Sequence, residues 1–140
     1  MKRLDTDEDR SWLVEARGKA IKIVSFLLTQ LPDANDYKVM FMHRNLDEVI
    51  KSQNRMLVQN GQPIAATSDE DFRGLYEKHL NSVKSFLGAR RCFEVLDVEY
   101  ATVLEAPRDE ATRMSRFVGR DLDVERMAAA VDRQLYRNRR

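Results

Sequence analysis

The sequence contains few glycines and prolines, a single cysteine and no long hydrophobic run. Five glycines and three prolines are scattered over 140 residues, so no flexible or low-complexity tract divides the chain into domains. Cys92 has no second cysteine with which to form a disulfide, and no apolar run reaches the roughly 18 residues of a membrane-spanning helix. The first ten residues, MKRLDTDEDR, lack the apolar segment of a secretion signal. We therefore expect one domain over residues 1–140, located in the reducing cytoplasm and without a membrane partner.

The chain also lacks an excess of charge of either sign. Its 24 lysines and arginines stand against 23 aspartates and glutamates, a formal net charge of +1. This balance produces no overall field that would attract nucleic acid, so any anion site must be local. Two histidines, His43 and His79, and one cysteine are too few for a metal cluster or for a cysteine–histidine nucleophile. We expect neither a nucleic acid partner nor a metal, and we interpret His79 as structural or surface-exposed.

The apolar residues that are present form helical and strand-like patterns in alternation. Strands are expected at YKVMFM and RCFEVLDVEY, which are rich in β-formers. Helices are expected where apolar residues recur every three or four positions, at 11–18, from 46 to the turn NGQP, and at 69–87, 108–118 and 123–136. The segment 19–32 fits either one helix or a strand at 20–24 followed by a short helix, and we favour the second. Five methionines at apolar positions are expected in the core: Met40, Met42, Met56, Met114 and Met127.

Strands separated by helical crossovers predict an α/β layer fold with a short parallel sheet flanked by helices. In such folds, ligand sites gather at the carboxyl ends of the strands. Arg44 stands at this position, between the first predicted strand and the helix that follows. Asn45 is the expected N-cap of that helix, and Asp47 and Glu48 occupy its first turn. The junction is therefore suited to a phosphate, which the guanidinium and the helix N-terminus would bind together.

Ser52 stands eight residues after Arg44, about 12 Å along the helix axis and close to two full turns. It lies on the same helix face as Glu48, so arginine and serine are predicted to meet across one anion. The alternative is an ordinary surface helix with a solvated polar stripe of Glu48, Ser52, Arg55 and Gln59. Spacing alone leaves both interpretations open.

The segment YKVMFMHRNLDEVIKSQNRML resembles the 3′-phosphate-binding segment of sulfotransferases that use 3′-phosphoadenosine 5′-phosphosulfate (PAPS). In that family a strand ends in an arginine, and a serine follows eight residues later on the next helix, as Arg44 and Ser52 do. The stretch FEVLDVEYATVLEAPRDEATRMSRFVG is similar to the family's later strand and tyrosine-bearing turn. The resemblance implies that Tyr100 lies beside the adenine, and that PAPS or adenosine 3′,5′-bisphosphate (PAP) is the cofactor.

The resemblance further implies a partial P-loop-type, sulfotransferase-like fold, with residues 1–140 as its C-terminal part. The implied reaction transfers a sulfuryl group to a hydroxyl acceptor that the sequence does not identify. The chain departs from the family because it lacks the Gly-rich phosphosulfate loop, the usual catalytic histidine and the late R-K-G motif. Lys22 is retained from the family's pattern, but the catalytic histidine that would follow it is absent. His43 is therefore the remaining candidate for the catalytic base.

Two functions of different class therefore follow from the sequence. The first is the nucleotide-binding half of a PAPS-dependent sulfotransferase, which would need an upstream Gly-rich loop for activity. The second is a non-catalytic nucleotide-binding or protein-interaction module derived from the same fold. In the second case another chain, or a second copy of this one, would cover an exposed strand edge.

Overall fold

The centre of the fold is a parallel pair of strands, β1 (Tyr37–His43) and β2 (Phe93–Glu99). A computed structural model describes residues 12–61 and 68–133. The register pairs Tyr37 with Phe93 and His43 with Glu99, so both strands end at the same edge of the sheet. The strands predicted at 37–42 and 91–100 and their parallel pairing are confirmed, and the structure has the expected mixed α/β class.

Two helices provide the crossover between the strands, α2 (Leu46–Gln59) and α3 (Asp69–Gly88). Asn45 caps α2 as predicted, because its side chain accepts a hydrogen bond of 2.9 Å from the backbone N–H of Asp47. Ser68 caps α3 by accepting one of 3.1 Å from the N–H of Asp71. These side chains satisfy N–H groups that lack partners within the helix, so both helices begin where the sequence places polar residues.

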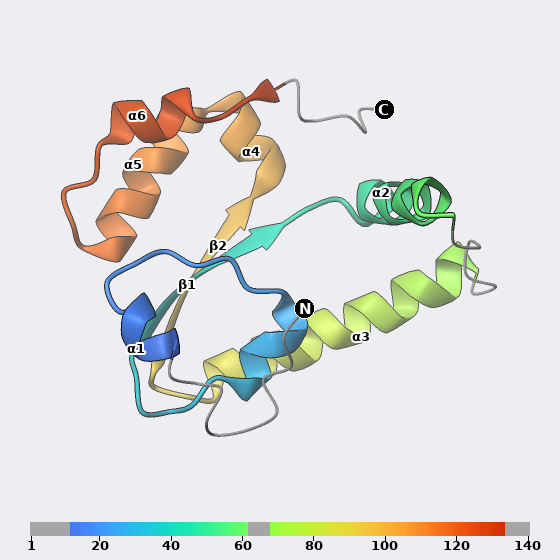
Figure 1. Cartoon of the computed structure of the whole chain (residues 1–140), viewed down its shortest axis with the longest axis horizontal. Coiled ribbons are helices and arrows are strands. Elements are labelled where there is room, and N and C mark those ends of the chain that lie inside the picture. The colour runs from blue at the N-terminus through green and yellow to red at the C-terminus, as the bar shows by residue number, and fades with distance from the viewer. Residues whose placement is uncertain (1–11, 62–67, 134–140) are drawn as a thin grey trace.

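The sheet lies between two helical layers (Figure 1). One face carries α3 and η2, a 3₁₀ helix at Ser25–Gln30, and the other carries α5 (Pro107–Val118). Phe41 and Phe93 of the strands pack with Val83 and Leu87 of α3 in the main apolar cluster. On the opposite face, the Lys38 ammonium lies 5.1 Å from the centroid of the Phe117 ring in α5. Alternate side chains of each strand thus face different layers.

The first helix of the described chain is α1 (Trp12–Ala16), and Gly18 follows it with φ of 72°. This left-handed conformation suits glycine and ends the helix as predicted, whereas the expected cap Ser11 lies outside the described residues. The predicted strand at 20–24 is wrong, because these residues form neither strand nor helix. Ile21 and Val24 are about half exposed, at 48% and 56%, so their apolar character does not bring the segment into the sheet.

The C-terminal part contains α4 (Tyr100–Glu105), α5 and α6 (Val124–Ala129). The predicted helix at 108–118 is confirmed as α5, which begins at Pro107 and ends at Val118, with Gly119 as its C-cap. Tyr100 was expected in a turn, but it begins α4. The helix predicted at 123–136 is too long, because α6 ends at Ala129 and residues 130–133 are not α-helical, while 134–136 lie outside the described residues.

Three methionines expected in the core are exposed. Met40, Met42 and Met56 have exposed fractions of 37%, 49% and 52%, whereas Met114 and Met127 are partly buried. Within the described residues the sheet has only two strands. Met40 and Met42 alternate in β1 with the buried Phe41 and so lie on the face away from α3, and Met56 lies on α2. None of the described helices is both long and apolar enough to cross a membrane.

Candidate functional site at the carboxyl edge of the sheet

Arg44 and Tyr100 meet at the carboxyl edge of the sheet. Each is the first residue after its strand, Arg44 after β1 and Tyr100 after β2. Because the parallel register ends both strands together, residues far apart in the sequence become neighbours. The guanidinium carbon of Arg44 lies 5.0 Å from the centroid of the Tyr100 ring, within the range of a cation–π contact. Two of the three residues predicted to bind the cofactor are therefore in contact.

Arg44 also forms an ion pair with Glu48 in the first turn of α2. Its Nε donates to Oε2 of Glu48 at 3.2 Å, and the two side chains are 31% and 13% exposed. The carboxylate is thus more deeply buried than the guanidinium that it contacts. An anionic ligand at Arg44 would have to share the guanidinium with this carboxylate or replace it.

Ser52 lies one turn after Glu48 on α2 and is exposed. Among the described residues, no hydrogen bond joins Ser52 to Arg44 or Tyr100. Since Glu48 and Ser52 are four residues apart, they occupy the same helix face. The glutamate therefore lies between arginine and serine along the helix, and its carboxylate is an anion that Arg44 contacts in this structure.

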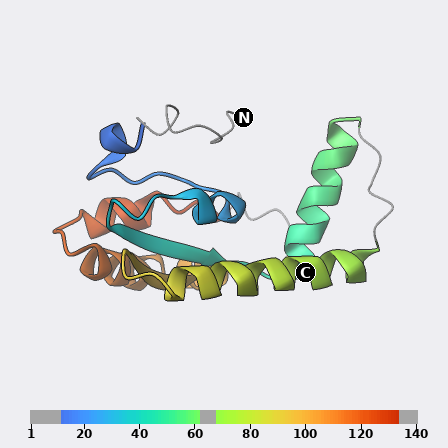
Figure 2. The same cartoon turned by 90° about the horizontal axis from the view of Figure 1, so that it is seen from below.

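The first turn of α2 is fixed to α3 by a second ion pair, in which Arg73 donates to Asp47. Figure 2 shows α2 leaving the sheet edge and meeting α3 near this point. Ile50, which is 5% exposed, is the buried residue of α2. These contacts hold the helix N-terminus, and with it Glu48, in a defined position beside Arg44.

Arg44, Glu48 and Tyr100 form what we call the edge cluster. His43 points to the other face of the sheet from these three residues. Its Nε2 hydrogen-bonds to Oδ1 of Asp97 on β2, and its ring centroid lies 5.1 Å from that of Phe41. Successive side chains of a strand alternate between faces, so His43 and Arg44 make separate sets of contacts. The candidate base is thus not brought to the predicted nucleotide residues.

Asp97 is shared between His43 and Lys84, whose Nζ lies 3.5 Å from Oδ1 of the carboxylate. The hydrogen bond from His43, with the charge of Lys84, holds the pKa of Asp97 below its usual range, although partial burial opposes this effect. Asp97 therefore stays ionised at neutral pH and can only accept hydrogen bonds.

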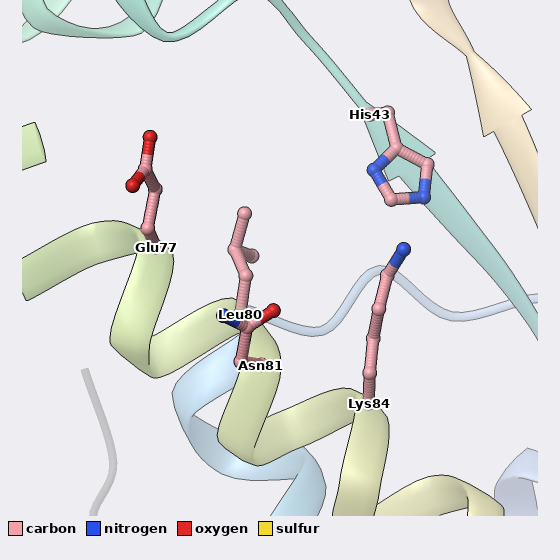
Figure 3. Close-up of a pocket in the computed structure, with 5 residues that line it drawn as sticks. All are labelled: His43, Glu77, Leu80, Asn81 and Lys84. Atoms are coloured by element: carbon pink, nitrogen blue, oxygen red, sulfur yellow. The ribbon is translucent and has the colours of Figure 1, made fainter. Parts of the chain in front are cut away.

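An open pocket of about 270 Å³ lies beside His43, between the end of β1 and α3. It is lined by His43, Glu77, Leu80, Asn81 and Lys84. Figure 3 shows Glu77, Leu80 and Lys84 projecting from α3 toward the strand, with the Lys84 nitrogen near the imidazole. This pocket is small compared with the cavities that hold drug-sized ligands.

Sequence reasoning missed Glu48, Asp97 and Lys84 as site residues. The spacing of four between Arg44 and Glu48 is the usual one for an ion pair near a helix N-terminus and would have indicated the contact. Asp97 was a charged residue between apolar residues of a predicted strand, which is itself a signal. Lys84 on α3 carried no comparable signal. His79 is structural as expected, since its Nε2 lies 2.9 Å from Oγ of Ser25 and its ring stacks on Phe26.

Among the described residues, no group of three or more His, Cys, Asp or Glu side chains is arranged to hold a metal ion. Comparisons with protein-family models, with curated proteins and with solved structures found no match for this chain.

Proposed function

We propose that the chain binds PAPS or PAP at the carboxyl edge of its sheet, as sulfotransferases do, with Arg44 and Tyr100 as the principal contacts. The observation that supports this best is the contact between these two side chains, 5.0 Å from guanidinium carbon to ring centroid. A nucleotide with a 3′-phosphate needs a cation and an aromatic surface close together, and the resemblance selected both residues from the sequence alone.

In this proposal the 3′-phosphate binds at Arg44, beside the N-terminus of α2. A helix N-terminus presents backbone N–H groups and the positive end of the helix dipole, which favour an anion. The phosphate replaces Glu48 as a partner of the guanidinium, because it carries more charge and more acceptor oxygens than a carboxylate. Ser52, one turn further along α2, adds a hydroxyl donor to the same phosphate.

Tyr100 provides the surface for the adenine. Stacking of a base on an aromatic side chain contributes about 1–3 kcal/mol and tolerates different bases, so the phosphate must supply the selectivity. The proposal includes a P-loop-type, sulfotransferase-like fold, in which the parallel strand pair between helical layers would form part of the sheet.

The test compares PAP with adenosine 5′-monophosphate (AMP), which lacks the 3′-phosphate. PAP should raise the thermal unfolding temperature of the chain, because a ligand that binds only the folded state stabilises it by mass action. AMP at the same concentration should raise it less. Equal shifts with the two nucleotides, or no shift with PAP, would contradict a site for the 3′-phosphate.

A second function, nucleotide binding without sulfuryl transfer, is supported by the position of His43. Its described contacts are with Asp97 and Phe41 rather than with Arg44 or Tyr100, and sulfuryl transfer needs a base that takes the proton of the acceptor hydroxyl. PAP release from PAPS in the presence of simple alcohols separates the two functions. Binding without release would favour a non-catalytic module, whereas release that depends on the alcohol would favour the enzyme.

A further inference from the structure

The outer edge of β1 is a feature that the nucleotide proposal does not use. In a parallel strand pair, the N–H and C=O of one residue point to the same side, and successive residues alternate between the two sides. The N–H of Tyr37 donates to the C=O of Cys92 at 2.7 Å, so the odd-numbered residues of β1 bond to β2. The even-numbered residues, Lys38, Met40 and Met42, therefore direct their backbone groups away from β2.

These outward groups have no partner within the described part of the chain. No hydrogen bond from another described residue reaches the N–H or C=O of the three residues. The outer edge of β2 differs, because the N–H of Phe93 donates to the C=O of Arg90 at 3.3 Å, and the C=O of Asp97 accepts from Arg113 at 2.7 Å. It is therefore the edge of β1 that presents a continuous row of donors and acceptors to which another strand can bond.

The side chains along this edge do little to protect it. Edge strands are commonly blunted by charged side chains, proline or a bulge. Lys38 lies near the start of β1, and its ammonium bonds to Glu94 of the same chain at 2.9 Å. Met40 and Met42 follow, with exposed fractions of 37% and 49%, and no proline interrupts the strand. The edge thus combines unpaired backbone groups with exposed apolar side chains, and an added β-strand covers both.

We propose that β1 of a second copy of this chain occupies the edge, paired antiparallel about a twofold axis at Met40. In this register Met40 faces Met40 of the second copy, and Lys38 faces Met42 of the second copy. Each such pair exchanges two hydrogen bonds, so the outward groups of all three residues are satisfied. The result is a four-stranded sheet in the order β2, β1, β1, β2, and the exposed methionines of the two copies cover one another.

Charge selects this register over its neighbours. An axis at Lys38 places two lysines opposite each other, and a register that pairs Met40 with Met42 places Lys38 opposite Arg44. Like charges directly opposite each other destabilise a strand pair. Other shifts leave Met42 or Lys38 without a partner in the strand. The axis at Met40 opposes no like charges within the strands, and just beyond them it brings Arg44 opposite Asp36 of the second copy, whose charge is of the other sign.

Sedimentation equilibrium of the full chain tests the proposal directly. We expect the average mass to rise with protein concentration from 16.3 kDa toward twice this value. A chain that stays monomeric up to near-millimolar concentration would overturn the proposal and favour a strand of another protein as the occupant. Growth beyond the dimer would contradict a closed twofold pair. The measurement needs no nucleotide, so its outcome is independent of the proposed PAP site.

Two methionine-to-lysine substitutions give a matched comparison. Met40→Lys places two ammonium groups opposite each other at the axis and removes an apolar contact, so it should weaken dimerisation about fivefold or more. Met56→Lys adds the same charge at an exposed position of α2 and should leave dimerisation unchanged. Circular dichroism checks that both variants are folded. Parent-like dimerisation of Met40→Lys, or equal weakening by the two substitutions, would overturn the assignment of the edge.

Cysteine cross-linking tests the register in a Cys92→Ser background. Met40→Cys places two thiols across the axis, where paired Cα atoms lie about 5.5 Å apart, within the range of a disulfide. Met42→Cys places its two thiols four residues out of step, about 13 Å along the strand, which is too far. Mild oxidation should therefore link the Met40→Cys chains into dimers and leave Met42→Cys monomeric. Equal cross-linking of the two variants, or none in folded Met40→Cys, would contradict the axis at Met40.

Discussion

The guanidinium of Arg44 lies against the ring of Tyr100, although 55 residues separate the two in the sequence. The contact arises because β1 and β2 are parallel and in register up to His43 and Glu99. The residues that follow the two strands therefore lie at the same edge of the sheet. Arg44 supplies a cation there, and Tyr100 supplies an aromatic face. Glu48 completes the cluster by pairing with the guanidinium.

The ion pair between Arg44 and Glu48 predicts that removal of the Glu48 charge should improve PAP binding. Glu48→Gln should raise the affinity for PAP about fivefold, corresponding to about 1 kcal/mol for one close charge pair in a partly solvated site. Titration calorimetry measures the effect, and circular dichroism checks that α2 remains folded. Glu94→Gln is the matched control, since Glu94 pairs with Lys38 near the other end of the sheet. Weaker binding by Glu48→Gln would show that phosphate does not compete with this carboxylate.

Tyr100 is expected to act through its ring rather than through its hydroxyl. Tyr100→Phe should keep PAP binding within about threefold, whereas Tyr100→Leu should lower it about tenfold or more, in line with 1–3 kcal/mol for base stacking. Fluorescence competition with an adenine nucleotide would measure both variants. Similar losses in the two variants would assign the contribution to the hydroxyl group and not to stacking.

The apolar core predicts that two leucines of α3 contribute unequally to the free energy of unfolding. Leu87 is 2% exposed and Leu75 is 62% exposed. Leu87→Ala should lower the free energy of unfolding by about 2–5 kcal/mol, because it removes buried methyl groups and leaves a cavity. Leu75→Ala should change it by less than about 0.5 kcal/mol. Urea unfolding of both variants tests the layer arrangement, and equal effects would contradict it.

The hydrogen bond between His43 and Asp97 predicts a dependence of stability on pH. The hydrogen bond from His43 holds the folded-state pKa of Asp97 below its usual value of 3.8, so its stabilising contribution is complete at neutral pH. The contribution is lost as the pH falls through the lowered pKa, because the carboxylate is then protonated in the folded state too. A double-mutant cycle of His43→Gln and Asp97→Asn should therefore show favourable coupling at neutral pH and none in strong acid. Coupling that persists in strong acid would contradict an ionised Asp97 as its source.

The helices and strands that the sequence predicted well are those with strong local signals. Asn45 has a side chain that caps α2, and the apolar face of residues 69–87 repeats at the helical period over five turns. Parallel pairing followed from the helices that separate the strands. The segment 20–24 was mispredicted because its apolar pattern fits several structures, and tertiary packing decided among them. Met40 and Met42 were mispredicted because burial depends on which layers cover a strand, and local sequence does not specify this.

The edge cluster was predicted in part. Arg44 and Tyr100 could be placed at neighbouring strand ends from the order of elements, and the structure brings them into contact. The sequence could not show whether Glu48 or a ligand would be the partner of Arg44, because this depends on how deeply Glu48 is buried. Its side chain is 13% exposed in the folded chain. The site of His43 and Asp97 depends on the strand register, which a single sequence with two short strands leaves open.

The most direct test of the central claim, that Arg44 binds the 3′-phosphate of a nucleotide, is calorimetric titration of PAP into the folded chain and three single-residue variants. The parent should bind one PAP per chain, and Arg44→Ala should weaken that binding about tenfold to a hundredfold, as expected for the loss of a charge-assisted contact. Ser52→Ala should lower it about tenfold. Arg91→Ala, which removes an exposed arginine before the start of β2, should bind as the parent does. Absence of heat from the folded parent, or equal affinity in Arg44→Ala, would contradict the claim.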